Sequence, residues 1–183
     1  RRQPMKRLLP VLALCAAIFS QTGHASKTKV SRAEISASER ALNSRLSNLW
    51  PGDPYLLLGT TRGVYLDGYG AVFTAEIDLA PGPSLNPFHQ FMTKQNVADN
   101  HKKMAERLPR LKTAMADMLA STASSLDTVP AGEKVVLGVT LTQYPWQDRT
   151  GIPSQVVMTG EKGKLIDAKR AGALEHAVTV EEF

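Results

Sequence analysis

Apolar and polar positions alternate along two segments of the chain, residues 70–79 and 134–144, and this alternation predicts two β-strands. On each segment the apolar side chains fall on one face, while polar or small residues fill most of the other. A strand with one polar face belongs to a sheet that is covered on one side only. The apolar faces comprise Ala71, Phe73, Ala75, Ile77 and Leu79 in the first segment, and Val135, Leu137, Val139 and Leu141 in the second.

Apolar residues also recur at helical spacing after Ser31, at positions 35, 42, 46 and 49. They predict a helix that stops at Trp50-Pro51-Gly52, because proline and glycine do not continue the helical hydrogen bonds. Ser31 and Glu34 predict a capping box, in which the side chain of each residue accepts the backbone N–H of the other.

A longer apolar stripe predicts a helix over residues 96–123, with Met104, Met115 and Met118 packed in the core. Pro109 lies inside this segment and removes one helical hydrogen bond. Because the stripe keeps its phase across Pro109, we favour one kinked helix over two helices of which the second begins at Pro109.

The order strand, helix, strand places residues 71–79 and 135–144 side by side in one sheet, with parallel directions. We therefore predict an α+β fold: a two-layer mixed β-sheet of about four or five strands, with one long kinked helix and shorter helices on one face. The shorter predicted elements are an extended stretch over 55–66 with a hairpin at Asp67-Gly68, a strand over 155–159, a turn over 160–163, helices over 164–169 and 173–177, and an extended segment over 178–180.

The first 25 residues have the pattern of a secretory signal peptide, with Met5-Lys6-Arg7 as a short basic start. The apolar run over residues 8–19 is shorter than the roughly 20 residues that a membrane span needs. Small residues then stand at the two positions that a signal peptidase reads. We predict a signal peptide over residues 1–25, cleavage between Ala25 and Ser26, and a single α+β domain over residues 26–183.

Two alternative kinds of export signal fit the sequence of this leader less well. A lipid attachment motif at Cys15 requires a small residue where Leu14 stands, and a twin-arginine signal at Arg1-Arg2 requires large apolar residues where Pro4-Met5 stands. If the leader is not cleaved, the protein becomes a structural part tethered to the envelope.

Removal of the predicted leader leaves a nearly neutral chain, and this changes which partners the composition favours. Residues 1–25 hold four of the 22 basic residues and no acidic residue, so the remaining chain has 18 basic against 17 acidic side chains. No basic stripe remains that favours nucleic acid. Cys15 is the only cysteine, so the predicted mature chain forms no disulfide and offers no thiolate for catalysis or metal binding.

No motif for a catalytic serine or a phosphate-binding loop occurs in the sequence. We therefore predict an exported soluble domain with a non-catalytic binding or accessory role in the cell envelope, and without a cofactor. The alternative is a periplasmic hydrolase-like enzyme that uses His89, Glu76 or Asp78 in acid–base chemistry. Solvated strand charges are the simpler explanation of Glu76 and Asp78, and the spacing of the histidines at 89, 101 and 176 does not predict a metal site.

Two aromatic residues in turns are the candidate partner-binding residues. Tyr69 lies between two glycines, which allow a tight turn that presents its ring to solvent. Trp146 follows Pro145 in a predicted loop. The structural alternatives are a hairpin corner for Tyr69 and a ring folded back on the sheet edge for Trp146.

The stretch Tyr65-Leu66-Asp67-Gly68-Tyr69-Gly70-Ala71-Val72-Phe73 resembles a hairpin of exported bacterial proteins of unassigned function. The resemblance covers residues 55–80 and the segment 178–183. It implies no activity and transfers no catalytic residue. The expected partner is an unknown protein or envelope component, and we expect no nucleic acid and no stable membrane span after cleavage. The expected location is periplasmic or extracellular.

Overall fold

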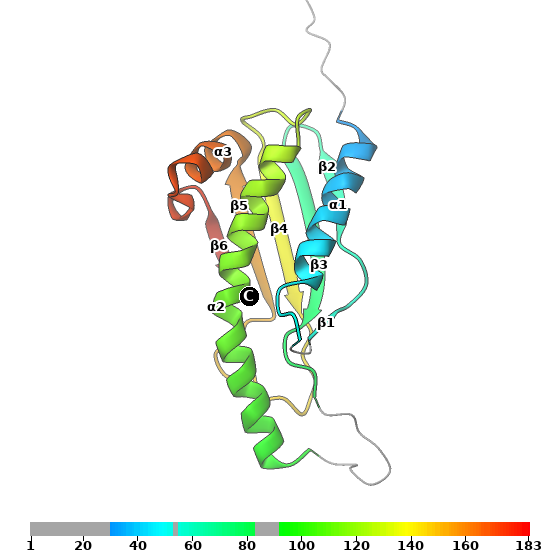
Figure 1. The fold of residues 1–183 in the computed structure, drawn as a ribbon, viewed down its shortest axis with the longest axis vertical. Helices are drawn as coiled ribbons and strands as arrows, with labels where there is room; N and C mark the ends of the chain where they lie inside the picture. Colours follow the sequence, from blue (N-terminus) through cyan, green and yellow to red (C-terminus); the bar gives the residue numbers. More distant parts are fainter. Residues whose placement is uncertain (1–29, 53–54, 83–91) are drawn as a thin grey trace, which may run out of the picture.

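The chain folds into a mixed β-sheet with its helices on one side, and the computed structural model describes residues 30–52, 55–82 and 92–183 (Figure 1). The predicted signal peptide, the cleavage position at Ala25 and Ser26, and His89 lie outside the described residues. The elements in chain order are α1 (Arg32–Ser47), β1 (Leu56–Leu57), β2 (Arg62–Leu66), β3 (Gly70–Asp78), α2 (Lys94–Ser125), β4 (Lys134–Leu141), β5 (Gln155–Glu161), α3 (Lys162–Ala171), the short 3-10 helix η1 (Leu174–His176) and β6 (Thr179–Glu182).

The sheet has six strands among the described residues, in the order β1-β3-β4-β5-β6, with β2 pairing with the other half of β3. The strands β3 and β4 are parallel, with Ala71 opposite Val135 and Ile77 opposite Leu141. All other strand pairs are antiparallel. The predicted α+β class, the mixed sheet and the parallel β3–β4 pair are therefore confirmed, and the sheet is one strand larger than predicted.

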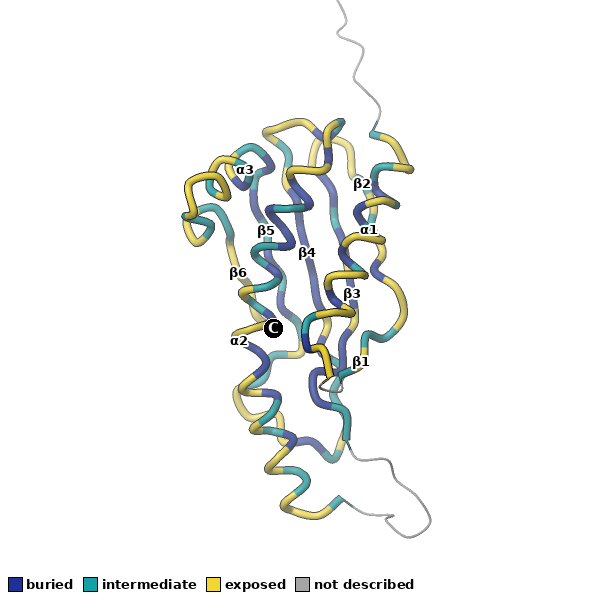
Figure 2. The backbone as a smooth tube through the Cα atoms, in the orientation of Figure 1, coloured by how far each residue is buried: buried dark blue, intermediate teal, exposed yellow. Residues whose placement is uncertain are grey.

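The hydrophobic core lies between the sheet and the helices, as Figure 2 shows by the buried positions along β3, β4 and the facing side of α2. Phe73 is buried, and so are the three methionines expected in the core, Met104, Met115 and Met118. On the opposite side of the sheet Thr74 is exposed, as the alternating pattern predicts for a sheet covered on one face.

The helix α2 continues through Pro109, which confirms one helix rather than two. It begins at Lys94, two residues before the predicted start. The reason is a capping box that the sequence analysis missed: Thr93 Oγ1 accepts the N–H of Asn96 at 3.1 Å, and Asn96 Oδ1 accepts the N–H of Thr93 at 3.1 Å.

The predicted capping box of α1 is only half correct. Ser31 is the N-cap residue, but its side chain accepts the N–H of Ala33 at 3.2 Å. Glu34 instead turns away from Ser31 and accepts the backbone N–H of Thr128 at 3.0 Å, and also the Thr128 hydroxyl. This carboxylate therefore joins α1 to the segment between α2 and β4, a contact that sequence spacing alone does not reveal.

The predicted turn over residues 160–163 is wrong. The strand β5 runs to Glu161, and α3 begins at the next residue, Lys162. Gly160 serves close packing here, since a Cβ atom at this position would lie 2.6 Å from Leu165 Cδ2. The side chain of Lys162 is buried and donates to the backbone carbonyl of Val129 at 2.6 Å, which holds α3 against the segment before β4.

Side chains of α1 cover the outer edge of β2. The N–H of Gly63 donates to Glu39 Oε1 at 2.8 Å, and Arg32 Nη1 donates to the carbonyl of Gly63 at 2.8 Å. The N–H of Thr61 donates to Asn43 Oδ1 at 3.1 Å. These contacts occupy backbone groups that would otherwise offer an open strand edge to another chain.

The same contacts predict a pH-dependent stability. Burial raises the pKa of Glu39, but the hydrogen bonds from Gly63 and Arg32 and the charges of Arg32 and Arg62 outweigh it, so its pKa is lower than usual. A carboxylate with a lowered pKa stabilises the fold above its unfolded pKa of about 4.3, and this contribution is lost as the pH falls through the folded value. We expect Glu39→Gln to flatten the decline in the free energy of unfolding between about pH 5 and pH 3. Urea unfolding over this range measures the slope, and equal slopes in both proteins would contradict the assignment.

Candidate functional site

Tyr69 lies in the turn between β2 and β3, as the hairpin pattern predicts. Gly68 and Gly70 on either side have positive φ values of 78° and 136°. The ring is 43% exposed, and the ammonium group of Lys134 lies 5.5 Å from the ring centroid. Tyr69 is therefore accessible to a partner, and its role in binding stays a prediction.

Trp146 does not project into solvent as a free contact residue. Its ring is partly buried and stacks on Tyr144, with 6.2 Å between the centroids and 8° between the planes. Its other neighbour is Gly82, where a Cβ atom would lie 2.5 Å from Trp146 Cζ2. Tyr69 precedes β3 and Trp146 follows β4, so the two predicted contact residues lie at opposite ends of a parallel strand pair and form no common surface.

The two strand carboxylates lie in different environments. Glu76 is exposed and accepts the hydroxyl of Thr142 at 2.6 Å. Asp78 is only 1% exposed, so its interpretation as a solvated strand charge is wrong. Burial raises the pKa of Asp78, although the N–H of Ala80 and the charge of Arg107 act in the opposite direction. At the end of β3 its Oδ1 atom accepts the N–H of Ala80 at 3.2 Å.

The described histidines do not come together. The Nδ1 atom of His101 lies 3.1 Å from the carbonyl oxygen of Asp148, and His176 lies 3.6 Å from the carboxylate of Glu175. Among residues 30–52, 55–82 and 92–183, no group of three or more histidine, cysteine, aspartate or glutamate side chains is arranged to hold a metal ion. The acid–base hypothesis stays a prediction, since His89 lies outside these residues.

A buried polar network closes the end of the sheet at which β3 and β4 finish. The side-chain amide of Asn100, on α2, donates to the carbonyl of Ala80. Gln147 in turn donates to Asn100 Oδ1 at 3.1 Å and accepts the N–H of Tyr144 at 2.8 Å. Because Asn100 and Gln147 are both buried, this network fixes α2 against the segments that follow both strands.

Arg107, two helical turns further along α2, has a second anchoring role. It is 3% exposed, and its guanidinium group donates to the carbonyl of Leu79. The same group lies 5.1 Å from the centroid of the Trp50 ring, within the range of a cation–π contact. Trp50 is held from another side by Tyr55, edge to face, at 5.0 Å between centroids. The position of this cation is thus set by three different parts of the chain.

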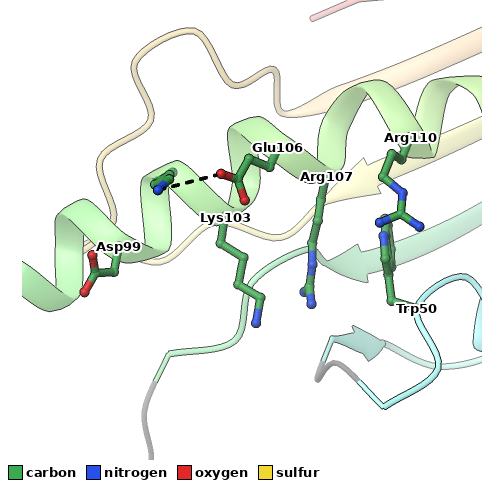
Figure 3. A pocket seen from close by; sticks show the side chains of 7 residues that line it. Trp50, Asp99, Lys103, Glu106, Arg107 and Arg110 are labelled. Carbon is green, nitrogen blue, oxygen red and sulfur yellow. Dashed lines mark ion pairs between the residues drawn. The ribbon is translucent and has the colours of Figure 1, made fainter.

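A cleft of about 380 Å³ opens beside Arg107 (Figure 3). Three basic residues, Lys103, Arg107 and Arg110, stand at positions i, i+4 and i+7 and therefore share one face of α2. Figure 3 shows their side chains extending from the helix in the same direction, with the Trp50 ring below Arg110. The full lining comprises Trp50, Asp99, Lys102, Lys103, Glu106, Arg107 and Arg110.

Basic residues outnumber acidic residues in this lining by four to two. One of the two carboxylates, Glu106, lies 4.0 Å from Lys102 in an exposed i,i+4 pair. A second cleft of about 440 Å³ shares Trp50 and Arg110 with the first and continues between α1 and α2 to Arg45 and Asp117. We call the two clefts together the α2 groove.

The indole N–H of Trp50, which lines both parts of the groove, is buried and has no hydrogen-bond partner within the part of the chain that the structure describes. Trp50 itself is only 6% exposed. A buried donor without an acceptor is uncommon in folded proteins. An acceptor on a ligand that opens the groove slightly would satisfy it.

This groove is not among the sequence predictions. There Trp50 marks a helix stop, and the i, i+4, i+7 spacing of the three basic residues is not used. That spacing was the available signal, but the contact between Trp50 and Arg107 joins residues 57 positions apart and depends on how α1 packs against α2.

Comparisons with protein-family models, with curated proteins and with solved structures find no significant match to this chain. Within the described ranges, none of the helices combines the length and the apolar character that crossing a membrane requires.

Proposed function

We propose that this chain is an exported, non-catalytic binding domain of the cell envelope, and that it holds an acidic ligand in the α2 groove. The observation that carries the proposal is the shared direction of Lys103, Arg107 and Arg110 toward a cleft beside Trp50. Export itself rests on the leader pattern of residues 1–25.

An anionic ligand suits this groove for two physical reasons. Cations that line one cleft add their fields, which raises the local concentration of anions and speeds their association. Arg107 is also held in place before any ligand arrives, by Leu79 and Trp50. A preorganised guanidinium group loses little side-chain freedom on binding, so more of the interaction energy appears as affinity.

The length of the groove favours an extended ligand. Its lining runs along α2 from Asp99 to Asp117, which corresponds to about 27 Å at 1.5 Å per residue. Lys103, Arg107 and Arg110 rise along the helix in steps of about 6 Å and about 4.5 Å. An acidic polysaccharide presents carboxylates at repeated intervals along such a length, and we commit to this class of ligand.

We expect the double variant Lys103→Gln/Arg110→Gln to bind polygalacturonate at least tenfold more weakly than the unchanged protein. Two partly exposed charges that each contribute about 0.7 kcal/mol account for this factor. Binding is measured by Trp50 fluorescence in a Trp146→Phe background, at low and at high salt. Added salt weakens the binding if the contacts are ionic.

The matched control is Lys164→Gln/Arg170→Gln, which removes two exposed basic residues of α3 outside the groove. This control should bind as the unchanged protein does, and uncharged dextran should not bind at all. Equal losses in both double variants would mean that only net charge matters, and an unchanged affinity of the groove variant would reject the site.

A further inference from the structure

A third cleft lies on the opposite face of α1, between this helix and the start of β2. Its volume is about 330 Å³. Arg45 of α1 lines the α2 groove, as does Leu49 just after the helix, whereas positions 39, 40, 43 and 44 of α1 lie on a different face of the helix from Arg45. The lining comprises Glu39, Arg40, Asn43, Ser44, Thr60, Thr61 and Arg62.

The strongest acceptors in this lining are already in use. Glu39 accepts from Arg32 at 2.9 Å and from the N–H of Gly63 at 2.8 Å. Asn43 Oδ1 accepts the N–H of Thr61 at 3.1 Å. These contacts also fix the position of the helix relative to the strand, so the two walls of the cleft are held at a constant separation.

The groups that remain are mainly donors. The side chains of Arg40 and Arg62 are exposed, and neither is in an ion pair or a side-chain hydrogen bond with the residues that the structure describes, although the charge of Arg62 helps to lower the pKa of Glu39. The amide N–H groups of Asn43 add two more donors. Thr61 is 2% exposed, and its hydroxyl has no hydrogen-bond partner in the described ranges. A cleft that offers donors and positive charge, with its acceptors saturated, selects ligands rich in acceptors.

We propose that this cleft binds a small metabolite through a carboxylate or phosphate group held between Arg40 and Arg62. The guanidinium group presents parallel N–H donors that match both anions. The volume lies at the lower end of the range of small-molecule sites. This cleft shares no lining residue with the two joined clefts of the α2 groove, so a compact ligand suits it better than an extended one. The carboxylate of Glu39 does not repel the anion strongly, since Arg32 and Gly63 already bind it.

Binding at this cleft has a structural consequence that the groove does not share. The anion bridges α1, through Arg40, to the first residue of β2, Arg62. A ligand that binds only the folded chain raises its unfolding temperature in proportion to the logarithm of its concentration above Kd. At tenfold Kd the expected increase is about 4 °C for a chain of this size.

The test titrates the full chain with inorganic phosphate in one series and with succinate in another, at constant ionic strength. The unfolding temperature should keep rising with the logarithm of the concentration of the anion that the cleft binds, once that concentration exceeds Kd. The two series distinguish the phosphate from the carboxylate as the recognised group. Calorimetric titration at 25 °C gives the affinity independently of unfolding.

The variants Arg40→Gln and Arg62→Gln should each weaken the affinity for the anion at least fivefold, and the double variant should abolish the rise in unfolding temperature. Arg149→Gln removes an exposed arginine outside the cleft and should leave the rise intact. The groove variant Lys103→Gln/Arg110→Gln should also show the full rise in unfolding temperature. The result at this cleft is therefore independent of whether the α2 groove binds a ligand. An absent rise with both anions, or an equal rise in the double variant, overturns the proposal.

Discussion

Replacing Gly70 by alanine is expected to destabilise the fold by about 3 kcal/mol or more. Gly70 is the first residue of β3 and has a φ of 136°, in a region that residues with a Cβ atom rarely adopt. A Cβ atom at this position would lie 1.8 Å from the carbonyl oxygen of Lys134. That oxygen belongs to the backbone of β4, so the strain is relieved only by moving one of the two parallel strands.

Gly68→Ala is the matched control, because it changes the other glycine of the same turn. Gly68 also has a positive φ, of 78°, but a Cβ atom there meets nothing within 4 Å. We expect a loss of about 1 kcal/mol for this variant, from backbone strain alone. Urea unfolding of both variants compares the two costs. If the two variants lose the same free energy of unfolding, the close approach to Lys134 adds nothing to the cost, and Gly70 is needed only for the backbone conformation of the turn.

Replacing Arg107 by alanine is expected to cost about 3 kcal/mol of unfolding free energy. The change removes the donor to the carbonyl of Leu79, removes the cation beside Trp50, and leaves a cavity in a site that is 3% exposed. Asp78 then also loses a nearby positive charge that favours its ionised form. The loss should therefore be larger at pH 7 than at pH 4, where Asp78 is more often protonated.

Arg110→Ala controls for the loss of a basic residue on the same helix. Arg110 is exposed, and we expect its replacement to change stability by no more than about 0.5 kcal/mol. Circular dichroism during urea unfolding measures both variants at the two pH values. A small effect of Arg107→Ala would mean that water replaces the guanidinium group, and that the buried position of Arg107 is not needed to hold the end of β3.

The regular elements were predictable because each has a local signal. The alternation from Ala71 to Leu79 predicts a strand, and the order of strand, helix and strand favours a parallel pair in one sheet. The apolar stripe keeps its phase across Pro109 and so favoured one continuous helix, and α2 does run through this residue.

Errors occurred where a side chain found a distant partner. Glu34 had a local partner available at Ser31 but binds Thr128, 94 positions away. Asp78 continued the polar face of its strand but is buried, with the charge of Arg107 nearby. In both cases the choice depends on which segments meet in space, and a window of neighbouring residues does not contain that information.

Most helices and strands, the α+β class and the covered face of the sheet were predictable from local patterns, because hydrophobic periodicity is a local property that the backbone translates directly into strands and helices. Which polar groups are buried and which of them meet depends on tertiary packing. Packing of α1 against α2 and β2 brings Trp50 to Arg107 and places Arg40 and Arg62 in the lining of one cleft, and so creates the two regions at which ligands are proposed to bind. In the sequence the lysines and arginines of these clefts are indistinguishable from ordinary surface residues. They line candidate binding sites only because neighbouring elements of the fold enclose them.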